Sequence, residues 1–129
     1  MRMVIDTNII VSALLSPNGA AYQILSDVLG GKYEVFVSQE IFQEYADVLR
    51  REKFGFNEDI IDYLLDWFRN NANWVEVTKS DIRMPDEKDR VFFDVAKCCR
   101  ARLLTGNIKH YPVDELVTAL DELVPPGSR

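Results

Sequence analysis

The first ten residues, Met1-Arg2-Met3-Val4-Ile5-Asp6-Thr7-Asn8-Ile9-Ile10, contain the pattern that decides the fold. The short run 2–5 is rich in β-forming residues, which predicts a strand, and three polar residues follow it directly. The run 9–15 is then apolar and predicts a helix. In α/β domains, ligands bind at the carboxyl ends of the strands, so the polar residues at 6–8 are the first candidates for function.

The rest of the chain continues this alternation of strands and helices. The sequence predicts further strands at 34–37, 74–77 and 102–104. It predicts further helices at 20–29, 39–51, 58–70 and 85–100. The C-terminal stretch leaves two alternatives, which are a short strand at 116–117 with a final turn, or one helix over 113–123. Strands that alternate with helices predict an α/β domain with a mainly parallel sheet of 4–5 strands.

Composition limits the class of protein. The 129 residues suit one domain, spanning 1–129, and 15 Lys and Arg against 21 Asp and Glu give a net charge of −6. No apolar run approaches the roughly 18 residues of a membrane span, and Asp6 interrupts any signal sequence. The adjacent Cys98 and Cys99 lack zinc-ligand spacing. We therefore expect a cytoplasmic protein without membrane contact. The acidic charge argues against coating nucleic acid by bulk charge, but it is compatible with an enzyme whose carboxylates hold a metal.

Four polar residues fall where the predicted elements would bring them to one edge of the sheet. They are Asp6, Glu44, Asp89 and Asn107. Asp6 and Asn107 follow predicted strands. Glu44 lies within the apolar stripe of its helix, and Asp89 begins an inward row of its own helix. Each also has a plainer interpretation: a helix cap for Asp6, a stripe-edge position for Glu44, a helix-start acid for Asp89 and a turn for Asn107.

The three carboxylates, gathered with the amide of Asn107 at one edge of a sheet, repel one another unless a divalent cation compensates their charge. The sequence therefore predicts a metal site. A side-chain nucleophile finds no support, because the single histidine, His110, is expected to be an exposed turn residue. Basic residues such as Lys88 and Arg90 are expected either to contact phosphates or to lie on solvated helix faces.

These residues, in this order along nearly the whole chain, resemble the PIN-domain nucleases, and most of all the small VapC-like toxins of toxin–antitoxin pairs. The resemblance rests on the run Val4 to Asn8, Glu44, Asp89 and the segment Leu104-Thr105-Gly106-Asn107. It implies a three-layer α/β/α sandwich and an endoribonuclease that depends on Mg²⁺ or Mn²⁺ and leaves a 5′-phosphate and a 3′-hydroxyl.

The resemblance also implies roles for individual residues. Asp6, Glu44 and Asp89 would be the metal ligands, and Asn107 would occupy a fourth catalytic position that many members fill with Asp. Polar residues around the acids would be Thr7, Asn8, Ser38 and Thr105, with Asp86 as an auxiliary acid or a helix cap. The implied partners are RNA, a second copy of the chain in a homodimer, and an antitoxin protein.

Two other classes of function stay open. An amide at 107 cannot supply a negative charge, which favours as an alternative a PIN-like module that binds RNA or protein without turnover. Another Mg²⁺-dependent phosphohydrolase is the third interpretation. A phosphatase of the haloacid dehalogenase type would need a second acid at position 8, where this chain has Asn8, and a phospho-acceptor receiver domain would need an Asp after its third strand.

Overall fold

The structure, a computed structural model, describes residues 1–126. Its centre is a five-stranded parallel sheet with strand order β3-β2-β1-β4-β5. The strands are β1 (Arg2–Ile5), β2 (Glu34–Val37), β3 (Asn73–Trp74), β4 (Arg102–Thr105) and β5 (Val117–Ala119). The helices are α1 (Thr7–Leu15), α2 (Ala20–Leu29), α3 (Gln39–Leu49), α4 (Glu58–Asn71), α5 (Arg90–Cys99) and α6 (Leu120–Leu123), with short 3₁₀ helices η1 (Glu87–Asp89) and η2 (Ile108–His110).

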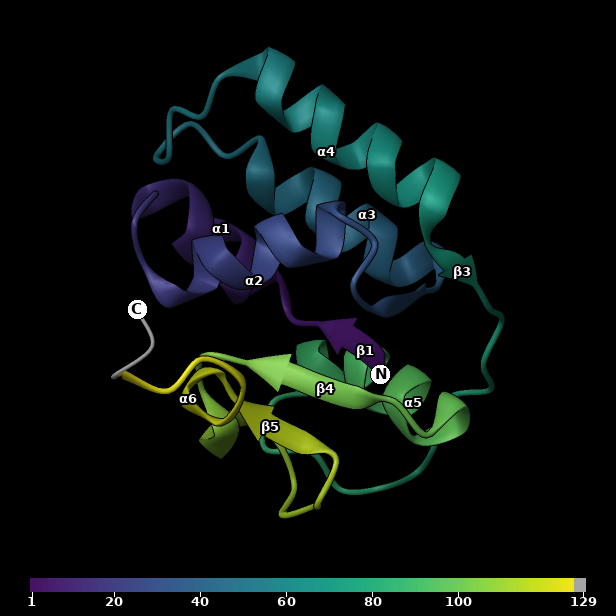
Figure 1. Ribbon diagram of the computed structural model, residues 1–129. Helices are drawn as coiled ribbons and strands as arrows, with labels where there is room; N and C mark the ends of the chain where they lie inside the picture. Colours follow the sequence, from purple (N-terminus) through teal and green to yellow (C-terminus); the bar gives the residue numbers. More distant parts are fainter. Residues whose placement is uncertain (127–129) are drawn as a thin grey trace.

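The order of the strands explains the three layers. The chain steps from β1 to β2 to β3 in one direction, so right-handed crossovers put α1 to α4 on one face of the sheet. It then returns past β1 to β4, which puts α5 on the other face, where it packs against β1, β2 and β4. Figure 1 shows α1 to α4 grouped together and α5 on the far side of β4. The predicted α/β/α sandwich is confirmed.

The core forms because the central strands are covered on both faces. Met3, Val4 and Ile5 are fully buried, as expected for a strand in the middle of a parallel sheet. On the α3–α4 side, the ring of Tyr45 packs 5.0 Å from that of Phe68. Capping then fixes where the helices begin: Ser38 Oγ accepts from the backbone of Ile41 at the start of α3.

Three predicted elements differ from the structure. The strand predicted at 74–77 is only Asn73–Trp74, because its partner β2 ends at Val37, where Ser38 starts a helix. The helix predicted at 85–100 is split, since residues 87–89 form a 3₁₀ turn before α5 begins. The helix predicted at 39–51 ends at Leu49. At the C-terminus the strand alternative is correct, with β5 followed by the short α6.

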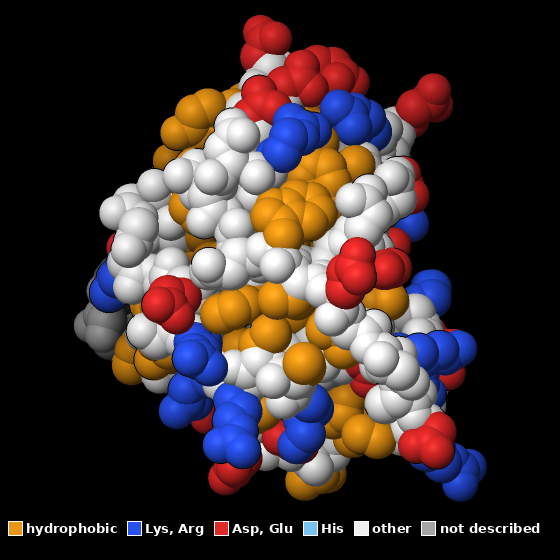
Figure 2. All heavy atoms as spheres, turned by 90° about the vertical axis from the view of Figure 1, so that its right-hand side faces the viewer, with side chains coloured by type: hydrophobic (Ala, Val, Ile, Leu, Met, Phe, Trp, Pro, Cys, Tyr) orange, Lys and Arg blue, Asp and Glu red, His pale blue; other side chains and the backbone are white. Residues whose placement is uncertain are grey.

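Charge is distributed unevenly between the two ends of the strands. Arg2 and Arg102 begin β1 and β4, while Asp6 follows β1 at the opposite end. Figure 2 shows the face toward which the strands begin, and most of its Lys and Arg side chains lie in the lower half. The basic side chains that start β1 and β4 therefore do not lie at the end that carries Asp6.

Across residues 1–126, no single helix has the length and apolar character to cross a membrane, although the bent pair α1 and α2 meets those criteria together.

Candidate metal-binding and catalytic site

Asp6 lies at the carboxyl end of β1, between the crossovers that leave the sheet in opposite directions. Ligands of open α/β sheets bind at such a point, where the strand order reverses. The backbone N–H of Asp6 donates to Leu104 O at 2.9 Å, which places the carboxylate beside the end of β4. The residue is only 6% exposed. A buried carboxylate is stable only when donors or a cation compensate it.

Three donors reach the Asp6 carboxylate. Oδ2 accepts from Tyr111 Oη at 2.7 Å and from Thr105 Oγ1 at 3.0 Å. Oδ1 accepts from the backbone N–H of Asn8 at 3.2 Å, which also caps α1. The plain cap interpretation of Asp6 is therefore correct but incomplete. Since an ionised carboxylate has about four acceptor positions, Asp6 retains capacity for a cation.

Asp89 is the second acid at this edge. It ends η1, its side chain is 17% exposed, and its Oδ2 is buried without a hydrogen-bond partner among residues 1–126. Burial, followed by the charges of Asp6 and Asp86, raises the pKa of Asp89 to about 6, while His110 and Lys88 act in the opposite direction. Asp6 and Asp89 are thus close enough for their charges to repel.

A ring of polar contacts ties the end of β4 to the start of α1. Asn8 Nδ2 donates to Thr105 Oγ1 at 3.3 Å, and the backbone N–H of Gly106 donates to Asn8 Oδ1 at 3.0 Å. The backbone N–H of Asn107 also donates to Thr105 Oγ1, at 3.1 Å. Thr7 is buried, and its Oγ1 has no hydrogen-bond partner in the part of the chain that the structure describes. Asn8 and Thr105 therefore hold the loops around Asp6.

Asn107 and His110 form a pair at the exposed rim. Asn107 Nδ2 lies 2.9 Å from His110 Nε2, and His110 Nδ1 lies 3.7 Å from Asp89 Oδ2. His110 is exposed, as the sequence predicts, but it is not merely a turn residue. Its ring connects the amide at 107 to the acid at 89.

Glu44, Ser38 and Asp86 occupy different surroundings. Glu44 is half-buried on α3, and it is not among the groups that shift the pKa of Asp89. Ser38 is buried as the cap of α3. Asp86 Oδ1 accepts from the backbone N–H of Lys88 at 3.1 Å, so it caps η1, and its charge also raises the pKa of Asp89. Within the described range, no three His, Cys, Asp or Glu side chains are grouped closely enough to hold one ion.

Two tyrosines belong to the site although the sequence analysis did not name them. Tyr111 contacts Asp6, and burial together with the Asp6 charge raises its pKa, so it stays a protonated donor. Tyr45 is fully buried and donates to Ile5 O at 2.5 Å, at the end of β1. The hydroxyl of a buried tyrosine needs a hydrogen-bond partner. The position of Tyr45 in the apolar stripe of its helix therefore indicated that its hydroxyl bonds to another part of the protein.

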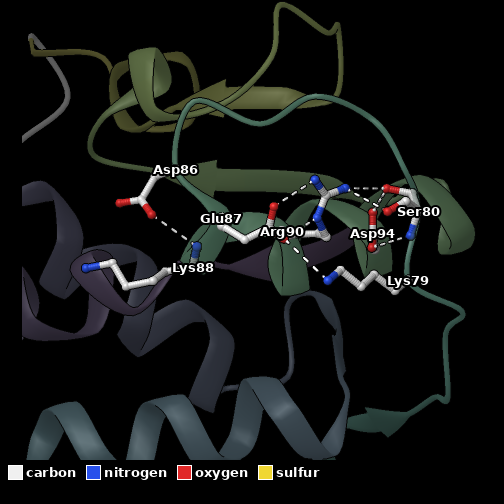
Figure 3. Close-up of polar contacts among 7 residues, drawn as sticks. All are labelled: Lys79, Ser80, Asp86, Glu87, Lys88, Arg90 and Asp94. Carbon is white, nitrogen blue, oxygen red and sulfur yellow. Dashed lines mark hydrogen bonds and ion pairs between the residues drawn. The ribbon is translucent and has the colours of Figure 1, made fainter.

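Arg90 does not lie on a solvated face. Its guanidinium is buried, where Nε and Nη2 donate to the Glu87 carboxylate and Nη1 donates to Ser80 O and Oγ, at 2.9 and 3.0 Å (Figure 3). Ser80 in turn donates to Asp94 through its hydroxyl and its backbone N–H. Arg90 therefore fastens the segment before η1 to α5, next to Asp89.

The acids at this edge fit a hard divalent cation. Mg²⁺ and Mn²⁺ prefer carboxylate oxygens, and Oδ2 of Asp89, which is buried and accepts no hydrogen bond within residues 1–126, is such an oxygen. Burial, followed by the charges of Asp6 and Asp86, raises the pKa of Asp89, and a bound cation would offset the cost of ionising it. Asp6 and Asp89 are the residues at this edge that could hold such an ion.

Comparison with known proteins agrees with this geometry. The PIN domain family profile matches residues 2–109. The uncharacterized protein MJ1680 of Methanocaldococcus jannaschii is 29% identical over 110 residues, which are 83% of this chain and 71% of that protein. The fold is similar to the crystal structure of VapBC2 from Rickettsia felis bound to a DNA fragment from their promoter, with a TM-score of 0.56 and 21% identity over 84% of this chain and 90% of that chain. Because the family profile covers most of the sequence, from β1 through β4 to η2, the chain belongs to the PIN domain family.

Proposed function

We propose that this chain is an endoribonuclease that depends on Mg²⁺ or Mn²⁺ and hydrolyses RNA phosphodiester bonds. The observation that carries the proposal is the pair Asp6 and Asp89 at the carboxyl edge of the sheet, with one buried carboxylate oxygen left without a hydrogen-bond donor. Membership of the PIN domain family, whose members are nucleases, supports the same reaction. Glu44, which is half-buried on α3, is proposed as a third ligand because the family resemblance implies it.

The chain's own residues have distinct tasks in this proposal. Asp6 and Asp89 bind the metal, and Tyr111 and Thr105 fix the orientation of the Asp6 carboxylate. A bound divalent ion would polarise the attacking water and stabilise charge on the phosphate. Asn107, paired with His110 at the rim, contacts the RNA or orients a water rather than neutralising the ion.

A cleavage assay tests the proposal directly. Purified protein is incubated with single-stranded RNA in Mg²⁺, in Mn²⁺ and in EDTA. Cleavage should require the metal and should be lost by at least 100-fold in Asp6→Asn and in Asp89→Asn, because ligands of one ion act as a unit. Glu76→Gln, which changes an exposed acid on the segment after β3, is the matched control and should retain full activity. Cleavage that persists in EDTA, or in both Asp variants, would overturn the assignment.

A second candidate is a PIN-like module that binds RNA without cleaving it. The side chain of Asn107 supports this alternative, since an amide paired with His110 adds no negative charge to a metal site. This candidate predicts RNA binding by anisotropy with no products at any metal concentration. Asn107→Asp would then be expected to create or increase metal-dependent cleavage.

We further propose that the chain acts in the cytoplasm as the toxin of a toxin–antitoxin pair and forms a homodimer. Similarity to the VapBC2 structure supports a protein partner. The surface of α4 supports an interface, because Ile60 and Tyr63 are 48% and 61% exposed on one helix. Growth arrest on expression, relieved by the product of a small neighbouring open reading frame, would support the toxin role.

A further inference from the structure

A pocket of about 270 Å³ opens between the start of α3, the segment after β3 and one side of α5. Its apolar wall consists of Val77, Val91 and Val95, and its polar groups include Ser38, Glu40 and Lys79. We refer to it as the valine pocket. None of the polar residues proposed for catalysis lines it except Ser38, so its chemistry requires a separate explanation.

The valine pocket lies at the same edge of the sheet as the two acids of the proposed site. Strands β1 and β2 are parallel neighbours. Asp6 directly follows β1 and Ser38, which lines the pocket, directly follows β2, so both residues lie at the carboxyl ends of neighbouring strands. On the other side, Arg90 lines the pocket and directly follows Asp89. A phosphate bound through a cation that the two acids would hold would therefore have its neighbouring nucleoside near the mouth of the pocket.

One wall of the pocket is rigid before any ligand binds. Arg90, Glu87 and Asp94 line it, and the bonds of Arg90 to Glu87 and Ser80, with those of Ser80 to Asp94, form a closed network (Figure 3). The guanidinium of Arg90 makes its contacts within the protein and is not free for a phosphate. Besides the apolar wall, a ligand would meet three exposed polar side chains, Glu40, Lys79 and Glu87, of which Glu87 already accepts from Arg90 through both oxygens.

Both rim residues, Glu40 and Lys79, are exposed to solvent. Glu40 is exposed in the first turn of α3. Lys79 is 75% exposed, and its Nζ lies 3.9 Å from Glu87 Oε2, which is too long for a strong ion pair. The valine pocket thus offers an apolar wall, one carboxylate acceptor and one ammonium donor.

These features fit a single nucleobase. The volume lies just below that of pockets that take drug-sized ligands, so it suits a smaller group such as a single base. A base in such a pocket lies against apolar side chains while polar groups bind its Watson–Crick edge. We propose that the valine pocket holds the base next to the scissile phosphate and that Glu40 selects bases with an exocyclic amino group. The position beside the scissile phosphate rests on the proposed ribonuclease function; base binding itself does not.

The selection follows from donor and acceptor chemistry. A carboxylate accepts from the amino group of cytosine, adenine or guanine. Uracil presents carbonyl oxygens on both sides of its single N–H, and these oxygens repel a carboxylate. Uracil is therefore the base that this pocket disfavours.

Titration of the full-length protein with ribonucleoside 5′-monophosphates tests the inference without the metal. The measurement is the methyl NMR shift of Val77, Val91 and Val95 in EDTA. CMP, AMP and GMP should shift these methyl groups and bind roughly 5- to 10-fold more tightly than UMP. This difference in affinity is what one additional hydrogen bond to the base is expected to give.

Two variants with matched controls locate the effect. Glu40→Gln gives the rim an amide that both donates and accepts, so the preference against UMP should fall to about 2-fold or less. The same change at exposed Glu76 should leave the preference intact. Val77→Phe should fill the pocket and weaken all four nucleotides, whereas Val113→Phe, at a fully exposed position, should not. If Val77→Phe fails to fold, the Glu40→Gln comparison still decides the outcome.

Equal binding of the four nucleotides, unshifted valine methyl groups, or a preference unchanged in Glu40→Gln would each overturn the inference. Failure of the ribonuclease proposal would give a different experimental result from failure of the base-binding proposal. In that case RNA would not be cleaved in any metal, while the nucleotides would still bind at the three valines with the expected order.

Discussion

Tyr111 Oη donates a hydrogen bond to Asp6 Oδ2 at 2.7 Å, although the two residues are 105 positions apart. Tyr111 is buried, with its ring 6.5 Å from that of Phe93, so the hydroxyl is held in place by packing. Thr105 donates to the same oxygen. The carboxylate at the centre of the proposed site is therefore oriented by the end of β4 and the segment that follows it, together with the backbone N–H of Asn8.

Tyr111→Phe should destabilise the protein by about 1.5–3 kcal/mol, the usual value for a hydrogen bond to a charged group. The ring is retained, so the loss reports on the hydroxyl alone. Denaturant unfolding monitored by tryptophan fluorescence measures it. Tyr63→Phe is the control, because Tyr63 is 61% exposed and should change stability by less than about 0.5 kcal/mol. Equal effects of the two variants would mean that the Asp6 contact contributes nothing.

Millimolar Mg²⁺ or Mn²⁺ should raise the Tm of the wild-type protein, because an ion that binds only the folded state stabilises it, by about 2.7 kcal/mol at 100 times its Kd. Asp6→Asn and Asp89→Asn should abolish the increase, and Glu76→Gln should preserve it. Glu44→Gln tests the third proposed ligand: if the metal raises the Tm of this variant less than that of wild type, Glu44 belongs to the ligands. A full increase in Glu44→Gln would limit the protein ligands to Asp6 and Asp89.

The metal-free protein should depend on pH through Asp89. Its pKa is about 6 when folded against about 3.9 in an unfolded chain, so the folded state binds more protons between these values. The contribution of this group to stability is therefore present below about pH 4 and is lost as pH rises through 6. Asp89→Asn removes the titration, so its Tm should exceed that of wild type by an amount on the order of 5 °C at pH 7.

The measurement is the difference in Tm between Asp89→Asn and wild type in EDTA, from pH 4 to pH 8. The difference should grow between about pH 4 and pH 6 and then level off. Comparing the two proteins cancels other carboxyl groups, such as Asp114, whose pKa is lowered by its hydrogen bond with Lys97 and whose effect on stability has the opposite sign. A difference that is constant with pH would contradict the raised pKa of Asp89, which burial and the charges of Asp6 and Asp86 cause.

Self-association should depend on the exposed residues of α4. Light scattering should report a dimer at micromolar concentration, and Ile60→Glu or Tyr63→Glu should shift it toward monomer with little change in Tm. Leu64 is unsuitable for this test despite its place on the same helix, because it is only 3% exposed and a charge there would unfold the core. If the protein is a monomer at every concentration, the prediction is wrong, and α4 serves only to cover the core of its own chain.

The fold was largely predictable because its signals are local. Apolar runs at 34–37 and 102–104, and caps such as Ser38 and Asn57, define elements from a few neighbouring residues. The predicted bounds were wrong where a strand's length depends on a pairing partner that is distant in the sequence. β3 stops after Trp74 because β2 has no backbone beyond Val37 left to pair with, and this depends on strand order.

The sequence by itself determined the α/β class, the parallel sheet and the presence of Asp6 and Asp89 near its carboxyl edge, because strand periodicity and helix caps act over short separations. Only the tertiary structure decided which donors surround Asp6, and that His110 faces Asp89. It also decided that the guanidinium of Arg90 donates its hydrogen bonds to Glu87 and Ser80. The physical reason is that these contacts depend on how distant segments pack. No local pattern marks a tyrosine at 111 as the partner of an aspartate at 6.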